Sequence, residues 1–179
     1  MVKLRNPVVL MVVVLWMLSG CARLVPREEQ APRWVTEGSG SFLTYQDKFF
    51  HAVGTARGVQ NRMLLRATAD NAARDALLPV LQAFGERLIR DAGTEFLSSE
   101  EISQHAGTLA RLNLRQALIS DHWQEPAGPG GGGRLFALCR LDLSVYKENL
   151  TRYRALDADL RRAMLDRADE VYRSMTAAP

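Results

Sequence analysis

The spacing of apolar residues predicts two helices in the middle of the chain. Apolar positions recur at three- and four-residue steps over residues 65–88, and Asn61 stands where a helix cap is expected. Pro79 lies inside this pattern and lacks a backbone N–H, so we expect either a kink or two shorter helices that meet there. Ser98 and Glu101 have the S-x-x-E spacing of a capping box, which predicts that a second helix begins there.

Extended segments flank these helices. Residues 48–59 are rich in apolar residues and contain two glycines, which predicts a strand with a close backbone approach or a bulge. A short strand is expected over residues 118–123, followed by a turn rich in Pro and Gly that includes Gly130–Gly133. Strict alternation starts at Arg134, so a hairpin is the simplest topology. One face of this last strand is expected to hold Leu135, Ala137, Cys139, Leu141 and Leu143.

A single long amphipathic helix is expected at the C-terminus. Ser144 can cap it, and an apolar stripe continues to Met175 with a period near that of a helix. Its length of roughly 46 Å, at about 1.5 Å per residue, exceeds the width of a domain of this size. We therefore expect its second half to lack cover from its own domain and to meet a partner through Met164, Val171 and Met175. The alternative is that the helix packs back across the sheet of its own domain.

These elements predict the α+β fold class. We expect a small antiparallel sheet of about three strands packed against helices, with a long C-terminal helix. The α+β domain is expected to span residues 41–143, and the C-terminal amphipathic helix residues 144–179.

The first twenty residues have the pattern of a secretory signal. Lys3 and Arg5 precede an uninterrupted apolar run at residues 8–18, which covers only roughly 17 Å of a bilayer core about 30 Å thick. Removing residues 1–20 leaves 21 basic against 20 acidic residues, although the whole chain has a pI near 9.1. A nearly neutral mature chain gives no support to non-specific nucleic-acid binding.

The residues at the end of this segment predict lipidation. Leu18-Ser19-Gly20-Cys21 resembles the bacterial lipoprotein box, in which the Cys thiol receives a diacylglyceryl group that carries fatty acids such as palmitate. The alternative is a plain signal peptide with a Cys at the junction. Lipidated Cys21 would leave Cys139 without a disulfide partner in the mature chain. Residues 21–40 are expected to form the lipidated N-terminus and a flexible tether.

No group of residues predicts catalysis, a metal site or a cofactor. His51, His105 and His122 are the only histidines, and none has the spacing of a metal-binding pair. Glu101 and His105 lie one helical turn apart and could form an acid–base pair, but solvated neighbours are the commoner outcome. Cys139 could act as a thiol nucleophile if His51 or His122 came near, yet its strand position favours a buried side chain.

The order of these motifs resembles the Lpp-twenty family of bacterial outer-membrane lipoproteins. The resemblance implies a small α+β domain without an established catalytic site, held by its lipid at the outer membrane, on the periplasmic side. Some members resemble accessory lipoproteins of the flagellar motor. This chain departs from the pattern by Pro79, by the glycine run and by the long C-terminal helix. The similarity rests on the lipoprotein box, Pro32-x-Trp34-Val35, Ala52-Val53-Gly54-Thr55-Ala56, Ala69, Ala72, Ala73-Arg74, Leu77 and Leu135-Phe136-Ala137-Leu138.

We therefore expect a non-enzymatic, lipid-anchored cell-envelope protein. Its partner would be another envelope or appendage protein, or a second copy of the chain, bound through the sheet edge or the C-terminal helix. The alternative is a peptidoglycan- or glycolipid-binding module, which would need a pocket lined by Trp34, Trp123 or tyrosines. A hydrolase is less favoured because no nucleophile, base and orienting group can be named together.

Overall fold

The structure, a computed structural model, describes residues 30–38, 48–93, 97–126 and 133–176. Every element described below belongs to one compact unit, Ala31–Pro179. The predicted signal segment and Cys21 lie outside the described residues. Within the described ranges, no helix combines the length and apolarity that crossing a membrane requires.

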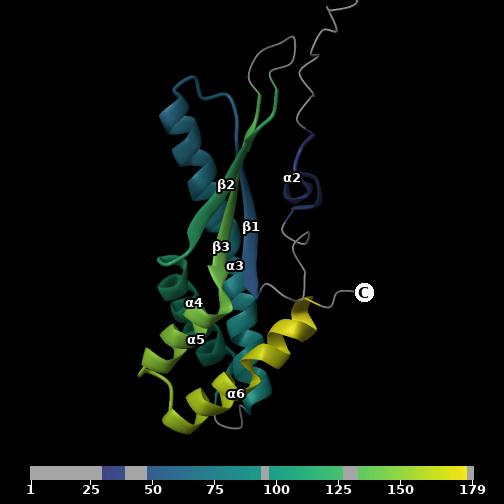
Figure 1. Ribbon diagram of the computed structural model, residues 1–179. Helices are drawn as coiled ribbons and strands as arrows, with labels where there is room; N and C mark the ends of the chain where they lie inside the picture. Colours follow the sequence, from purple (N-terminus) through teal and green to yellow (C-terminus); the bar gives the residue numbers. More distant parts are fainter. Residues whose placement is uncertain (1–29, 39–47, 94–96, 127–132, 177–179) are drawn as a thin grey trace, which may run out of the picture. The chain divides into compact units, whose positions relative to one another are not determined.

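Three strands form an antiparallel sheet in the order β1-β3-β2, which confirms the predicted α+β class (Figure 1). β1 (Phe49–Ala56) pairs along its whole length with β3 (Leu135–Asp142). β2 (Leu118–Gln124) pairs with the other side of β3 and forms the predicted hairpin with it. The burial of alternate β3 side chains against helix α3 confirms the face predicted for Cys139.

The long helix α3 (Arg62–Ala92) provides the main support of the sheet. The side-chain oxygen of Asn61 accepts hydrogen bonds from the backbone N–H groups of Met63 and Leu64 at 3.0 and 3.1 Å, so the predicted cap is confirmed. The helix continues through Pro79, and two separate helices do not form. Its core-facing stripe consists of Leu65, Ala69, Ala73, Leu77, Leu81, Phe84 and Leu88.

Small residues let α3 approach β1 closely. A Cβ atom built on Gly54 of β1 would lie 2.0 Å from the backbone nitrogen of Ala73 and 2.5 Å from the carbonyl oxygen of Ala69. Only hydrogen fits in that space, which explains why glycine faces an alanine-rich turn of the helix.

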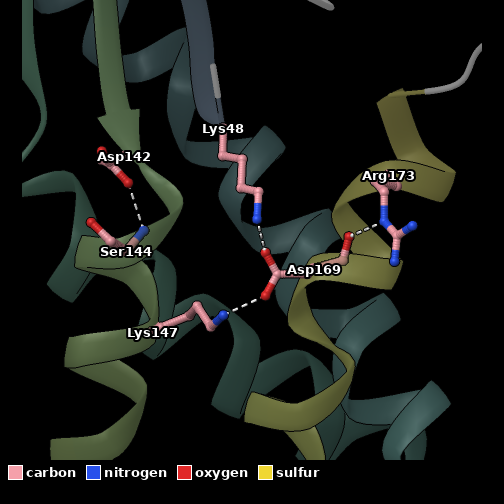
Figure 2. Close-up of polar contacts among 6 residues, drawn as sticks. All are labelled: Lys48, Asp142, Ser144, Lys147, Asp169 and Arg173. Carbon is pink, nitrogen blue, oxygen red and sulfur yellow. Dashed lines mark hydrogen bonds and ion pairs between the residues drawn. The ribbon is translucent and has the colours of Figure 1, made fainter. Parts of the chain in front are cut away.

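The helices α4 (Ser99–Leu114) and α5 (Leu143–Arg152) pack on this framework. Both halves of the predicted capping box at the start of α4 are present, because Ser98 and Glu101 bond each other's backbone N–H groups. The cap of α5 differs from the prediction: Asp142 is the capping residue, and it accepts from the N–H of Ser144 at 2.7 Å (Figure 2).

The single C-terminal helix predicted over residues 144–175 is wrong. The chain leaves the helical conformation after Arg152, and a second helix, α6, spans Ala158–Thr176. Asp157 starts α6 by accepting from the N–H groups of Asp159 and Leu160 at 2.8 and 3.3 Å. The apolar stripe kept its period across the break because Leu156 in the connection is itself buried, so periodicity alone did not reveal the turn.

Part of the predicted tether is also structured. Residues Arg33–Glu37 form the short helix α2, and Trp34 within it is only 5% exposed. Trp34 packs with Phe136 and Leu138, two β3 residues on the sheet face opposite to α3. Burial of one large aromatic side chain therefore holds this segment against the sheet, where composition had indicated a flexible connection.

Candidate functional site

The expectation that Met164 and Val171 lack cover from their own domain is wrong. Met164 is fully buried and Val171 is 2% exposed, because α6 folds back and packs on α3 and α5. Met175 remains exposed at 42%. Neither buried residue is available to a partner in the folded chain, so Met175 alone of the three remains a candidate contact.

Ion pairs fasten α6 to the rest of the domain (Figure 2). Asp169 on α6 bonds Lys48, which precedes β1, and Lys147 on α5, both at 2.5 Å. Hydrogen bonds from both lysines hold the pKa of Asp169 below its ordinary value, and the bond from Lys147 has the larger effect. Figure 2 shows that the two lysines come from separate elements and meet at one carboxylate.

Aromatic side chains close the core beneath α6. The rings of Phe50 and Tyr172 meet edge to face with centroids 5.2 Å apart, and the Tyr172 hydroxyl donates to the carbonyl oxygen of Phe49 at 2.8 Å. Phe84 and Tyr146 complete the cluster with centroids 4.9 Å apart. This half of α6 is thus a structural element of the domain.

Cys139 lies in the core, as predicted. Its side chain is buried on β3, and burial raises the pKa of the thiol to about 11. A thiol with such a pKa is almost entirely protonated near neutral pH, so it is a poor nucleophile. The His122 ring instead pairs with Asp70, with 2.5 Å between Nε2 and Oδ1.

The proposed acid–base pair does not form a shared site. The Glu101 carboxylate accepts from the N–H and hydroxyl of Ser98, and these bonds lower its pKa. The His105 ring instead bonds the Tyr153 hydroxyl at 3.0 Å. Each group therefore has a structural partner, one at a helix cap and one between α4 and the connection after α5.

A cluster of polar residues missed by the sequence reasoning lies between α3 and β2. His122 Nε2 is 2.5 Å from Asp70 Oδ1, and His122 Nδ1 is 3.3 Å from an Arg66 nitrogen. Arg66 and Asp70 are one helical turn apart, a spacing that could have indicated a shared partner, but only the strand register brings His122 to them. In the described residues, no group of three His, Cys, Asp or Glu side chains could hold a metal ion.

One cavity of about 460 Å³ opens where α4 meets the connection between α5 and α6. Its walls are mostly apolar, and the polar groups on them are His105, Asp157 and Asp159. Asp157 is already used to start α6. Neither Trp34 nor Trp123 lines this cavity, and both pack around Phe136 on the sheet instead. This cavity is therefore not the pocket lined by tryptophan that was expected for glycan binding.

The most accessible part of the sheet is the edge strand β2. β1 is largely buried, whereas β2 carries exposed or half-buried side chains throughout, and Leu118 is 71% exposed. One side of β2 pairs with β3, and no described strand pairs with the other. A register shift between Ile119 and Asp121 divides it, so residues 121–124 form the regular segment of the open edge. Such an edge can accept an additional strand.

Comparison with protein-family models and with curated proteins identifies no relative. No protein-family model matches the sequence, and no curated protein matches it. The resemblance to the Lpp-twenty lipoproteins therefore stays a prediction from the motifs quoted above.

Proposed function

We propose that the chain is a non-enzymatic, lipid-anchored protein of the bacterial cell envelope that binds another envelope or appendage protein through the open edge of β2. The observation that supports this most is the exposed strand β2, whose outer side pairs with no described strand. The terminal helix was the other predicted binding surface, and its apolar face is buried in the domain. A partner that adds a strand along β2 would gain main-chain hydrogen bonds there.

Photo-crosslinking in intact cells tests the partner surface. A photoreactive residue in place of Asp121 on β2 should yield a discrete adduct, whereas the same residue in place of exposed Ala83 on α3 should not. Adding Ser120→Lys and Gln124→Lys, two exposed β2 positions, should weaken the adduct because charges on an edge oppose strand addition. Equal adducts from both positions, or no effect of the lysines, would contradict the proposal.

Metabolic labelling with palmitate tests the anchor separately. Cys21→Ser should block cleavage at the lipoprotein box and leave an unprocessed chain without acyl groups on residue 21. The lipoprotein hypothesis predicts that labelled palmitate is incorporated into the native chain and not into the Cys21→Ser variant. Cys139→Ser is the matched control and should keep the label. Label retained by Cys21→Ser would exclude lipidation at Cys21.

A further inference from the structure

An exposed apolar pair stands at the beginning of α3. Met63 is 84% exposed and Leu64 is 58% exposed, although Met and Leu are large apolar residues that are usually buried. They follow each other directly in the first turn of the helix, and Asn61 fixes that turn by capping both N–H groups. Figure 1 shows that α3 starts at the end of the sheet farthest from α6.

The charged residues that neighbour this pair in the sequence are all positive. Arg57, Arg62 and Arg66 are exposed, and the chain has no acidic residue from Lys48 to Ala69. The first turn of α3 contains no acidic residue either. The dipole of a helix favours acidic residues at its start, so a basic first turn does not serve helix stability. We name residues 57–66 the basic tip.

The apolar area of the basic tip is too small for a stable protein interface, but its apolar and basic side chains suit a lipid surface. Two adjacent apolar side chains fall far short of the roughly 800 Å² per partner that stable protein complexes bury. Peripheral membrane proteins commonly insert apolar side chains into the acyl region of the bilayer and place arginines at the level of the anionic headgroups. Residues 57–66 contain three arginines and no acidic residue, whereas the chain without residues 1–20 has a net charge near zero.

We propose that the basic tip docks on an anionic membrane surface, with Met63 and Leu64 inserted among the lipids and the arginines at the phosphates. This inference does not depend on a partner at β2 or on acylation of Cys21. Each arginine near an anionic surface strengthens binding by about fivefold, from roughly 1 kcal/mol of attraction. Docking is therefore expected on phosphatidylglycerol and not on zwitterionic phosphatidylcholine.

Lipid quenching of a probe on the full chain tests this proposal. The chain carries Cys21→Ala, so that buried Cys139 is its remaining thiol, and a fluorescent maleimide is attached through Met63→Cys. The protein is reconstituted in vesicles that contain brominated lipids. We expect strong quenching at position 63 in phosphatidylglycerol vesicles, weak quenching in phosphatidylcholine vesicles, and a marked loss of quenching in 0.5 M salt, because salt screens the arginines.

Two controls decide the outcome. The same probe placed through Met175→Cys, an exposed position on α6, should stay unquenched in both vesicles, which separates docking of the tip from mere proximity to the membrane. Arg57→Gln with Arg62→Gln should abolish most of the quenching at position 63 while the circular dichroism spectrum is unchanged. Equal quenching at positions 63 and 175, or quenching at 63 that is independent of lipid charge, would overturn the proposal.

Discussion

Gly54 is the residue at which the fold tolerates change least. Gly54→Ala would place a Cβ within 2.0 Å of the α3 backbone, and separation of β1 from α3 should lower the free energy of unfolding by about 3 kcal/mol or more. The matched control is Gly107→Ala in α4, where the nearest atom to the new Cβ would be 3.6 Å away. Helix propensity should make that change neutral or stabilising by up to about 1 kcal/mol. Urea unfolding of both variants measures the difference.

Tyr146 carries a polar atom that the core does not use. Within the described part of the chain its buried hydroxyl has no hydrogen-bond partner, and burial raises its pKa well above the ordinary value. Tyr146→Phe removes the unsatisfied group and keeps the ring contacts, so it should stabilise the protein by about 1 kcal/mol. Tyr153→Phe, which loses the bond to His105, should be destabilising by about 0.5–1 kcal/mol. A Tyr146→Phe variant that melts below the native protein would show that the hydroxyl has a partner in solution.

Among the elements, α6 is expected to contribute to the stability of the domain. Met164→Ala should cost about 2–5 kcal/mol, because the side chain is fully buried and its removal leaves a cavity. Met175→Ala, in the same helix at an exposed position, should change the free energy of unfolding by less than about 0.5 kcal/mol. Thermal unfolding compares the two. Small losses of stability in both variants would indicate that the apolar face of α6 is not packed against the domain.

The junction of α6 with β1 and α5 should respond to acid. Asp169 has a pKa below its ordinary value of 3.8, so its ionised form stabilises the fold above that pH, and this contribution disappears as the pH falls through the lower pKa of the folded state. Asp169→Asn should be less stable than the native protein by about 1 kcal/mol or less near pH 6, since the pairs are partly exposed, and the difference should vanish as the pH falls through the lowered pKa of Asp169 in the folded state. Asp166→Asn, at an exposed acid on the same helix, is the matched control for the loss of one negative charge from α6.

The elements whose pattern is local were predictable, and those that depend on distant contacts were not. The capping box at Ser98 and the alternation around Cys139 are encoded within a few residues, and both were confirmed. The end of α5 at Arg152 was missed because a turn with a buried Leu156 leaves the helical period unbroken. Helix α2 was missed because Trp34 gains its stability from β3, about a hundred residues later.

At the scale of the whole molecule, the sequence predicted which layers exist but not which surfaces remain open. The fold class followed from the order of strands and helices, whereas the burial of Met164 required knowing that α6 turns back onto α3. The Asp70–His122 contact likewise depends on the register of β2 with β3. The basic tip could have been predicted from the sequence, because no acidic residue lies between Lys48 and Ala69 although the cap at Asn61 starts a helix there.

The contacts at Lys48 give the domain a mechanical property. Its carbonyl oxygen accepts from the N–H of Leu143 at 2.8 Å, its ammonium group binds Asp169, and the next carbonyl accepts from Tyr172. Tension applied to the chain before residue 48 therefore reaches α5 and α6 before it reaches the hydrogen bonds between β1 and β3. Once the packing of Trp34 on β3 has been lost, a protein pulled from its N-terminal side carries the load on the contacts of Lys48 before it carries it on the hydrogen bonds between β1 and β3.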